Sequence, residues 1–153
     1  MPNVRSILSI ATLGLFLTAC GGSDSPTGPS NSNGNDGGAG GVTRTIKADP
    51  SFGQDVFEVL QRRGRTASSC HGGGAGGLTL ASSSGAFTAL VGVASSATGE
   101  ILVIASDAAN SYLVKKLEGT ASAGQQMPLG GAALDNIDLT NIKNWINQGA
   151  KNN

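Results

Sequence analysis

The sequence predicts a small all-α domain that follows a long polar segment. Apolar residues recur at helical spacing in several stretches between residues 50 and 149, capping residues bound these stretches, and no convincing alternating strand pattern is present. The chain from about residue 42 to residue 149 suits one domain of about a hundred residues, near the most common domain size. We therefore expect a single helical domain in residues 42–153.

Four helices are expected in this domain. The first begins at Asp49 as N-cap, with Pro50 in its first turn, and ends at Gly64. The second covers 84–91, and the third covers 110–118 and stops at Gly119. The fourth begins at the N-cap Asp135 and ends at Gly149. Residues 101–104 are apolar but few, so they form either a short strand or a buried extended link; we favour the link. The apolar positions expected to face inward are Phe52, Val56, Val59, Leu60, Phe87, Leu90, Val91, Leu113, Leu117, Leu139, Ile142, Trp145 and Ile146.

Residues 1–19 have the order of an export signal. Arg5 precedes an apolar run over 7–17 that is too short for a membrane helix, and small residues precede Cys20. The tetrapeptide Leu17-Thr18-Ala19-Cys20 resembles the lipobox of bacterial lipoproteins. The resemblance implies that Cys20 becomes the lipidated first residue of the mature chain. The alternative is a secretory peptide with a coincidental cysteine.

Residues 20–41 join the lipidation site to the domain. After Cys20 this segment consists of Gly, Ser, Asn, Pro, Thr and Ala with two aspartates, and it cannot bury enough apolar surface to offset its chain entropy. We expect a disordered tether, with a typical span of roughly 25 Å. The predicted location is the periplasmic side of the cell envelope, anchored by lipid, with the outer membrane favoured.

Three chemically special residues occur once each after Cys20: Cys70, His71 and Met127. An imidazole and a methionine sulfur on opposite faces of the iron form the axial ligand pair of electron-transfer haem proteins, and a cysteine before the histidine can form a thioether with a haem vinyl group. If Cys20 is lipidated, Cys70 has no disulfide partner in an oxidising compartment, and a thioether would occupy it. The other interpretation is a buried cysteine, a hydrogen-bonded histidine and a space-filling methionine.

Together these pieces resemble the small monohaem cytochrome c domains of bacterial lipoproteins, over about residues 50–150. The resemblance rests on an ordered set of motifs, which are the first helix, Ser69-Cys70-His71-Gly72-Gly73, Gly77-Leu78-Thr79-Leu80, Phe87 to Val91, Ser111-Tyr112-Leu113, Met127-Pro128, Leu134 and Ile142 to Ala150. It implies a class I cytochrome c fold, with the first and last helices packed beside the haem. It also implies His71 as proximal ligand, Met127 as distal ligand and Cys70 as the thioether residue.

The sequence departs from this family at the first attachment cysteine. Position 67 is alanine, and position 65, the position for a rarer longer spacing, is arginine. Ser68 and Ser69 cannot replace the missing thiol, because a hydroxyl lacks its nucleophilicity. The expected cofactor is therefore one iron-containing haem c held by a single thioether.

Two further features allow two interpretations each. Arg62, Arg63 and Arg65 form either a solvated helix end or a site for haem propionates or an acidic partner. The glycines over 72–77 form either a flexible linker or a backbone that approaches a flat ligand closely. The domain has few aromatic residues, so we expect a thin core that a porphyrin would fill.

The sequence thus predicts a membrane-tethered one-electron carrier whose partners are redox proteins. The alternative is a haem-free interaction or structural lipoprotein that keeps the cytochrome shape. Enzymatic activity such as that of a peroxidase is not expected, because Met127 would block the open iron position and no second histidine, paired carboxylates or zinc-type cluster is present. Balanced charge argues against nucleic acid. No small-molecule substrate is evident.

Overall fold

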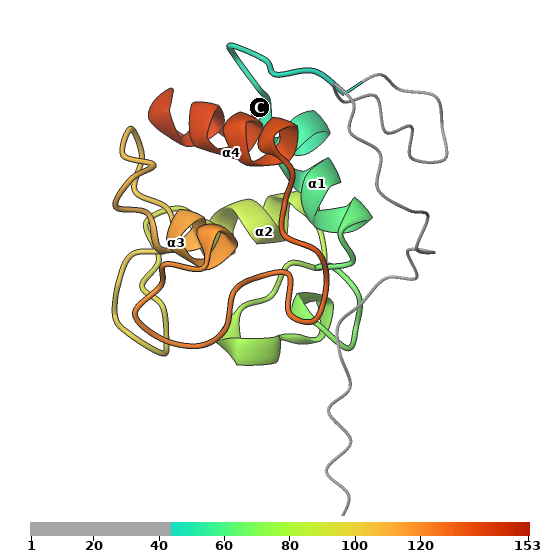
Figure 1. Cartoon of the computed structure of the whole chain (residues 1–153), viewed down its shortest axis with the longest axis vertical. Coiled ribbons are helices and arrows are strands. Elements are labelled where there is room, and N and C mark those ends of the chain that lie inside the picture. The colour runs from blue at the N-terminus through green and yellow to red at the C-terminus, as the bar shows by residue number, and fades with distance from the viewer. Residues whose placement is uncertain (1–43) are drawn as a thin grey trace, which may run out of the picture.

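The computed structural model describes residues 44–153 as a bundle of short helices joined by long loops (Figure 1). No β-strand occurs within this range, where the only ladder contacts are isolated bridges near residues 91–107. The prediction of an all-α domain is therefore confirmed, and residues 101–104 form the expected extended link. In chain order the elements are the π-helical turn η1 (Phe52–Val56), α1 (Phe57–Arg62), the 3₁₀ turns η2 (His71–Gly73) and η3 (Ala75–Gly77), α2 (Ser83–Leu90), α3 (Tyr112–Glu118) and α4 (Asn136–Asn147).

The predicted signal sequence, the lipidation site Cys20 and the tether over 20–41 all lie outside the described residues. Among residues 44–153, none of the helices has the length and apolar character needed to cross a bilayer.

The start of the first helix differs from the prediction. Ser51, not Asp49, is the N-cap: its backbone is extended, and its Oγ accepts a hydrogen bond of 3.2 Å from the Gln54 amide. Asp55 reinforces this cap, because its carboxylate accepts a hydrogen bond of 2.8 Å from the Ser51 amide. Two cap-type residues flank Pro50, and tertiary packing of Phe52 decides between them. The first turn, η1, is also wider than a regular α-helical turn.

The other helix boundaries lie close to the predicted ones. α2 begins one residue early, with the Ser82 Oγ as its cap, and α3 begins at Tyr112 rather than at 110. Gly119 ends α3 in the left-handed conformation (φ +76°), and Asp135 caps α4 by accepting a hydrogen bond of 3.0 Å from the Asp138 amide. Local capping signals therefore predicted these ends correctly.

The core is built where η1 packs against α4. Phe52 is fully buried, and its ring centroid lies 5.0 Å from that of Trp145, 5.3 Å from that of Phe87 and 6.3 Å from that of Phe57. The Trp145 indole donates a hydrogen bond of 2.8 Å to the Lys151 carbonyl, which closes the C-terminal end over the core. The first and last helical segments thus pack together, which is the coarse part of the arrangement that the family resemblance implied. The remaining core residues are Val56, Val59, Leu60, Leu80, Ala86, Leu90, Val103, Ala108, Leu113, Val114, Leu117, Ile142, Ile146 and Ala150.

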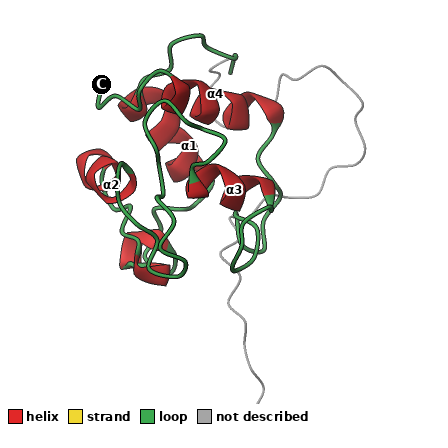
Figure 2. Cartoon of the chain, turned by 90° about the vertical axis from the view of Figure 1, so that its left-hand side faces the viewer, coloured by secondary structure: helices red, strands yellow, loops and turns green. Residues whose placement is uncertain are grey.

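Residues 44–47 form a strap along α4. Asn141 of α4 accepts a hydrogen bond of 2.8 Å from the Lys47 amide and donates one of 2.9 Å to the Thr45 carbonyl. Asn144, one turn later, donates a hydrogen bond of 2.7 Å to the Lys47 carbonyl. In Figures 1 and 2, α4 lies at one end of the long axis, and Figure 1 shows residues 71–77 at the other end. The strap therefore lies at the end of the molecule remote from the Cys-His dipeptide.

Candidate functional site: the Cys-His turn and the Met127 loop

The dipeptide of Cys70 and His71 lies in a tightly hydrogen-bonded segment, residues 66–77, which we name the Cys-His turn. The Ala67 carbonyl accepts hydrogen bonds from the amides of Cys70 (2.9 Å) and Gly72 (3.0 Å). The His71 carbonyl accepts a hydrogen bond of 2.8 Å from the amide of Leu80, whose side chain is 2% exposed. The residues before and after His71 are thus held within the turn, and the carbonyl of His71 itself is held to the buried Leu80.

Two glycines permit this compact turn. A Cβ added at Gly72 would lie 1.9 Å from the Thr66 carbonyl oxygen, and one at Gly73 would lie 2.0 Å from the Ser68 carbonyl oxygen. Glycine is therefore required here because the chain approaches itself. The flexible-linker interpretation is wrong for this segment, and the close approach that glycine allows at Gly72 and Gly73 is to the protein's own backbone.

The His71 imidazole is half-buried, and its Nδ1 lies 2.7 Å from the Ala75 carbonyl oxygen. A carbonyl only accepts, so Nδ1 carries the proton, and in the neutral ring Nε2 keeps a free lone pair. A hydrogen bond from one ring nitrogen to a carbonyl commonly fixes the tautomer and orientation of a metal-binding histidine. The turn therefore presents one imidazole nitrogen in a form able to bind a metal.

Cys70 is buried, with 4% of its surface exposed, and it is disulfide-bonded. This differs from the expectation that Cys70 has no disulfide partner. The chain contains one other cysteine, Cys20, which lies outside the described residues. Vinyl addition needs a thiolate, so a sulfur in a disulfide cannot form a haem thioether. The disulfide and the thioether are alternative states of the same sulfur.

Met127 lies in the segment 119–128 between α3 and α4, which we name the Met127 loop. Its side chain is half-buried and packs against the core, so it is not an exposed side chain on a polar loop. Its amide donates a hydrogen bond of 2.8 Å to the carbonyl of Lys116 in α3. Figure 1 shows the segment between α3 and α4 crossing the end of the molecule that holds residues 71–77. His71 and Met127 thus come from two loops at one end of the domain.

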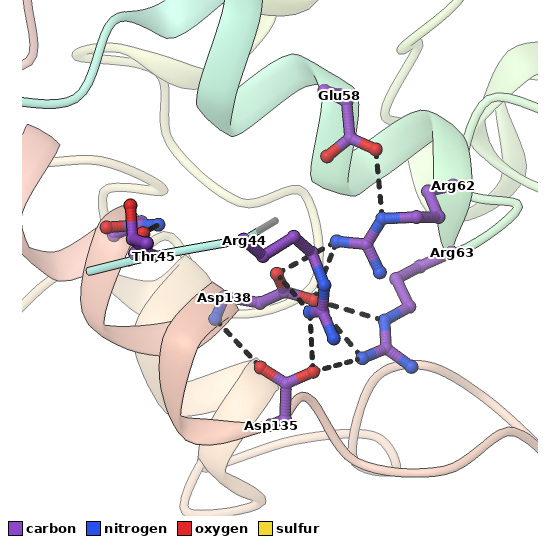
Figure 3. A network of polar contacts seen from close by, with 8 residues as sticks. Arg44, Thr45, Glu58, Arg62, Arg63, Asp135 and Asp138 are labelled. Atoms are coloured by element: carbon purple, nitrogen blue, oxygen red, sulfur yellow. Dashed lines mark hydrogen bonds and ion pairs between the residues drawn. The ribbon is translucent and has the colours of Figure 1, made fainter. Parts of the chain in front are cut away.

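Arg62 and Arg63, at the end of α1, reach toward Asp135 and Asp138 at the start of α4 (Figure 3). The Arg62 Nη2 lies 2.8 and 2.9 Å from the two carboxylate oxygens of Asp138, whose side chain is 2% exposed. The Arg63 Nη2 lies 3.1 Å from Asp138 and 2.9 Å from Asp135. Arg44 of the strap contacts the same two carboxylates, at 3.0 and 2.7 Å. We name these five residues the arginine–aspartate network.

This network settles how two members of the arginine cluster are used. Arg62 and Arg63 are already paired with carboxylates, so neither is a solvated helix end, and pairing with haem propionates would require each to change partners. Arg65 is 6% exposed, and its Nε donates a hydrogen bond of 2.7 Å to the Arg63 carbonyl. Burial, and next the charge of Arg63, lower the pKa of the Arg65 guanidinium.

Sequence reasoning missed the partners of these arginines. Asp135 and Asp138 occupy the N-cap and the first turn of α4, which is where acidic residues are favoured. That spacing indicates a local pair of carboxylates, but it does not show that arginines 72 to 94 positions away supply the cations. Among residues 44–153, no cluster of three or more His, Cys, Asp or Glu side chains could hold a metal ion.

Comparison with protein families, with curated proteins and with solved structures finds no match to this chain.

Proposed function

We propose that this chain is a membrane-tethered one-electron carrier with a single c-type haem, attached through Cys70 and ligated by His71 and Met127. The observation that carries the proposal is the hydrogen bond from the His71 Nδ1 to the Ala75 carbonyl. It leaves Nε2 as the binding atom, in the residue directly after the only cysteine of the described domain. When bound, the haem would supply a ferric/ferrous couple.

The donor set fits a haem better than a free metal ion. The His71 imidazole and the Met127 sulfur are a donor pair that would suit haem iron, whereas structural zinc sites use about four nitrogen, sulfur or carboxylate ligands. The half-buried position of Met127 against the core also suits a sulfur that must be kept from water. A His/Met pair in an apolar setting favours a relatively high reduction potential.

Haem attachment requires that Cys70 first be reduced. A dithiol reductant would supply two electrons and two protons to the disulfide, which leaves two thiols, that of Cys70 and that of the cysteine bonded to it. The Cys70 thiol would then hold the haem through a thioether bond to one of its vinyl groups. Only one such bond can form, because positions 65 and 67 are arginine and alanine.

In the proposed tether, Cys20 is lipidated through its sulfur, which therefore cannot also be part of a disulfide, and residues 21–41 are the spacer that holds the domain on the periplasmic side of a membrane. The strap enters the domain beside α4, and the two candidate ligand loops lie at the other end (Figure 1). This arrangement supports the proposal because the loops would face away from the attachment point, toward redox partner proteins. No substrate chemistry is required.

The test is a haem stain after denaturing electrophoresis of protein made in a host with cytochrome maturation enzymes. We expect a stained band for the parent chain and for the matched control Ser68→Ala, and none for Cys70→Ser. Circular dichroism of all three checks that they fold. A folded parent chain without stain would overturn the proposal.

Met127→Ala supplies an independent prediction on the same protein. Loss of the Met127 sulfur should abolish the sulfur-to-iron absorption band and lower the reduction potential. The covalent haem stain should persist, because Cys70 is unchanged. Absorption spectroscopy and potentiometric titration measure both effects. An unchanged spectrum would remove Met127 from the ligand set.

A second candidate is a haem-free interaction or structural module, and the disulfide at Cys70 is the observation that favours it. In that case the native protein, alkylated without reduction, should show no modified cysteine, and hemin should not bind. Alkylation of Cys70 only after reduction, combined with a colourless matured protein, would select this function.

A further inference from the structure

The Met127 loop folds back over the last turn of α3 and encloses the side chain of Lys116. The Lys116 ammonium donates a hydrogen bond of 3.2 Å to the Ala123 carbonyl and another to the Gln125 carbonyl. Gly124, between these two residues, has φ +72°, and a Cβ there would lie 2.9 Å from the Lys116 Nζ. The loop therefore curls closely around one positive charge.

Lys116 differs from the neighbouring lysines Lys115 and Lys143 in the partners of its ammonium group. Lys115 pairs with Glu100 and Lys143 pairs with Glu118, whereas within residues 44–153 Lys116 forms no ion pair and its ammonium donates to carbonyls. It is half-buried, and burial lowers the pKa of its ammonium. In the part of the chain that the structure describes, the Lys116 ammonium donates only to loop carbonyls, and a partly desolvated cation held in this way acts to order the loop.

The backbone of Lys116 holds the other end of the same loop. Its carbonyl accepts the hydrogen bond of 2.8 Å from the Met127 amide. Two neighbours add to the attachment: the Gln126 Nε2 donates to the Leu117 carbonyl at 2.8 Å, and the Tyr112 hydroxyl donates to the Ala123 carbonyl at 2.9 Å. One residue of α3 thus contacts the loop before Met127 through its side chain and at Met127 through its backbone.

We propose that Lys116 is a positioning residue, which holds the Met127 loop on α3 and so keeps the Met127 sulfur in place for iron. This inference rests on the proposed function for its consequence at iron. The attachment of the loop to α3 can be measured without a haem. The attachment of the loop to α3 and its effect on the iron ligand can therefore be refuted independently of each other.

The test compares Lys116→Leu, which removes the ammonium, with Lys116→Arg, which keeps a charged donor. Lys143→Leu is the matched control, because it loses an ion pair of α4 without a hydrogen bond to the Met127 loop. Gly124→Ala is a second route to the same disruption, because its Cβ would displace the Lys116 ammonium.

The first measurement is hydrogen exchange of the Met127 amide, in protein with or without haem. We expect exchange about tenfold faster in Lys116→Leu and Gly124→Ala, about parental rates in Lys116→Arg and Lys143→Leu, and unchanged exchange of the α4 amides in all. Parental exchange at Met127 in Lys116→Leu would overturn the proposal.

The second measurement is the rate at which added imidazole displaces the Met127 sulfur from ferric haem, followed by loss of the sulfur-to-iron band. We expect this rate to rise about tenfold in Lys116→Leu and to return to within about twofold of the parent in Lys116→Arg. Faster hydrogen exchange of the Met127 amide in Lys116→Leu, with an unchanged rate of displacement of the Met127 sulfur, would show that Lys116 does not hold the iron ligand in place. A chain that takes up no haem overturns the proposed function, and the exchange measurement then decides on Lys116 as the residue that holds the loop.

Discussion

At the scale of single residues, Asp138 is the carboxylate that pairs with the largest number of arginines among residues 44–153. It is almost fully buried and is contacted by the guanidiniums of Arg44, Arg62 and Arg63, from the strap and from α1 (Figure 3). If the charge of Asp138 is removed, the partly buried arginines lose their counter-charge. The resulting loss of stability is larger than the net stability that the intact network contributes. Asp138 therefore joins three segments through one carboxylate.

We predict that Asp138→Asn lowers the free energy of unfolding by about 3 kcal/mol, measured by urea unfolding. Glu58→Gln is the control, because Glu58 forms an exposed pair with Arg62 within α1 and its loss should change stability by less than about 0.5 kcal/mol. Equal effects of the two substitutions would show that the network contributes no more than a surface ion pair.

Gly72 illustrates what a single-residue reading of the sequence can and cannot predict. The glycines after His71 indicated either a linker or a close backbone approach, and the sequence does not say which backbone approaches. The answer depends on the path of residues 66–68, which no periodic pattern specifies. The hydrogen bond from the His71 imidazole to the Ala75 carbonyl cannot be predicted from the sequence either, although both residues lie within the same turn.

Gly72→Ala should open the Cys-His turn, because its Cβ would collide with the Thr66 and Ala67 carbonyls. We expect a loss of about 2 kcal/mol in unfolding free energy and faster hydrogen exchange of the Leu80 amide, which binds the His71 carbonyl. Gly53→Ala, whose Cβ meets its nearest neighbour at 3.5 Å, should leave both unchanged or slightly improved. If the two alanine variants behaved alike, the turn would not be as tightly packed as described.

At the scale of elements, capping residues predicted the ends of α3 and α4 because the groups that satisfy a helix end are local. The same reasoning placed the first N-cap at Asp49 instead of Ser51, since both residues can cap and the choice depends on burial of Phe52. The π-helical turn η1 has no local sequence signal. Packing of the first helical segment, η1, against α4 was expected from the resemblance, but the ionic contacts between α1 and α4 were not.

The N-cap of α4 gives a prediction about pH. Burial acts to raise the pKa of the Asp135 carboxyl, but the Asp138 amide and then Arg44 outweigh it, so the pKa lies below its ordinary value. A carboxyl with a depressed native pKa adds stability that is present above its unfolded pKa of about 4 and is lost as the pH falls through the native value.

Asp135→Asn keeps an equally good N-cap and removes the charge. Urea unfolding should show the parent more stable than the variant by less than about 1 kcal/mol near neutral pH, because Asp135 is partly exposed. This difference should be constant above about pH 5 and should shrink as the pH falls below about 4. A difference that is independent of pH, or that grows in acid, would contradict the assignment.

At the scale of the whole molecule, the domain is divided between a structural end and a candidate functional end. The strap and the arginine–aspartate network meet at α4, while the Cys-His turn and the Met127 loop lie opposite (Figure 1). The all-α class was predictable because helical periodicity is local. The relation between the two loops was not, because it depends on how helices separated by long loops pack.

The core also bears on the central claim. The sequence led us to expect a thin core that a porphyrin would complete, and in the structure Phe52, Phe57, Phe87 and Trp145 pack into one aromatic cluster at the junction of η1 and α4. A haem between the two ligand loops would therefore add to an existing core on the opposite side of the domain from α4. The proposal thus requires the loops, and not the α4 end, to change when haem binds.

The most direct test of the central claim is the intact mass of the purified chain, produced with cytochrome maturation enzymes and measured after reduction. The account predicts the mass of the chain plus one haem, with fragmentation placing the haem on the peptide that contains Cys70 and His71. A folded protein with the mass of the haem-free chain, whose Cys70 is released as a thiol only by the reductant, would contradict it.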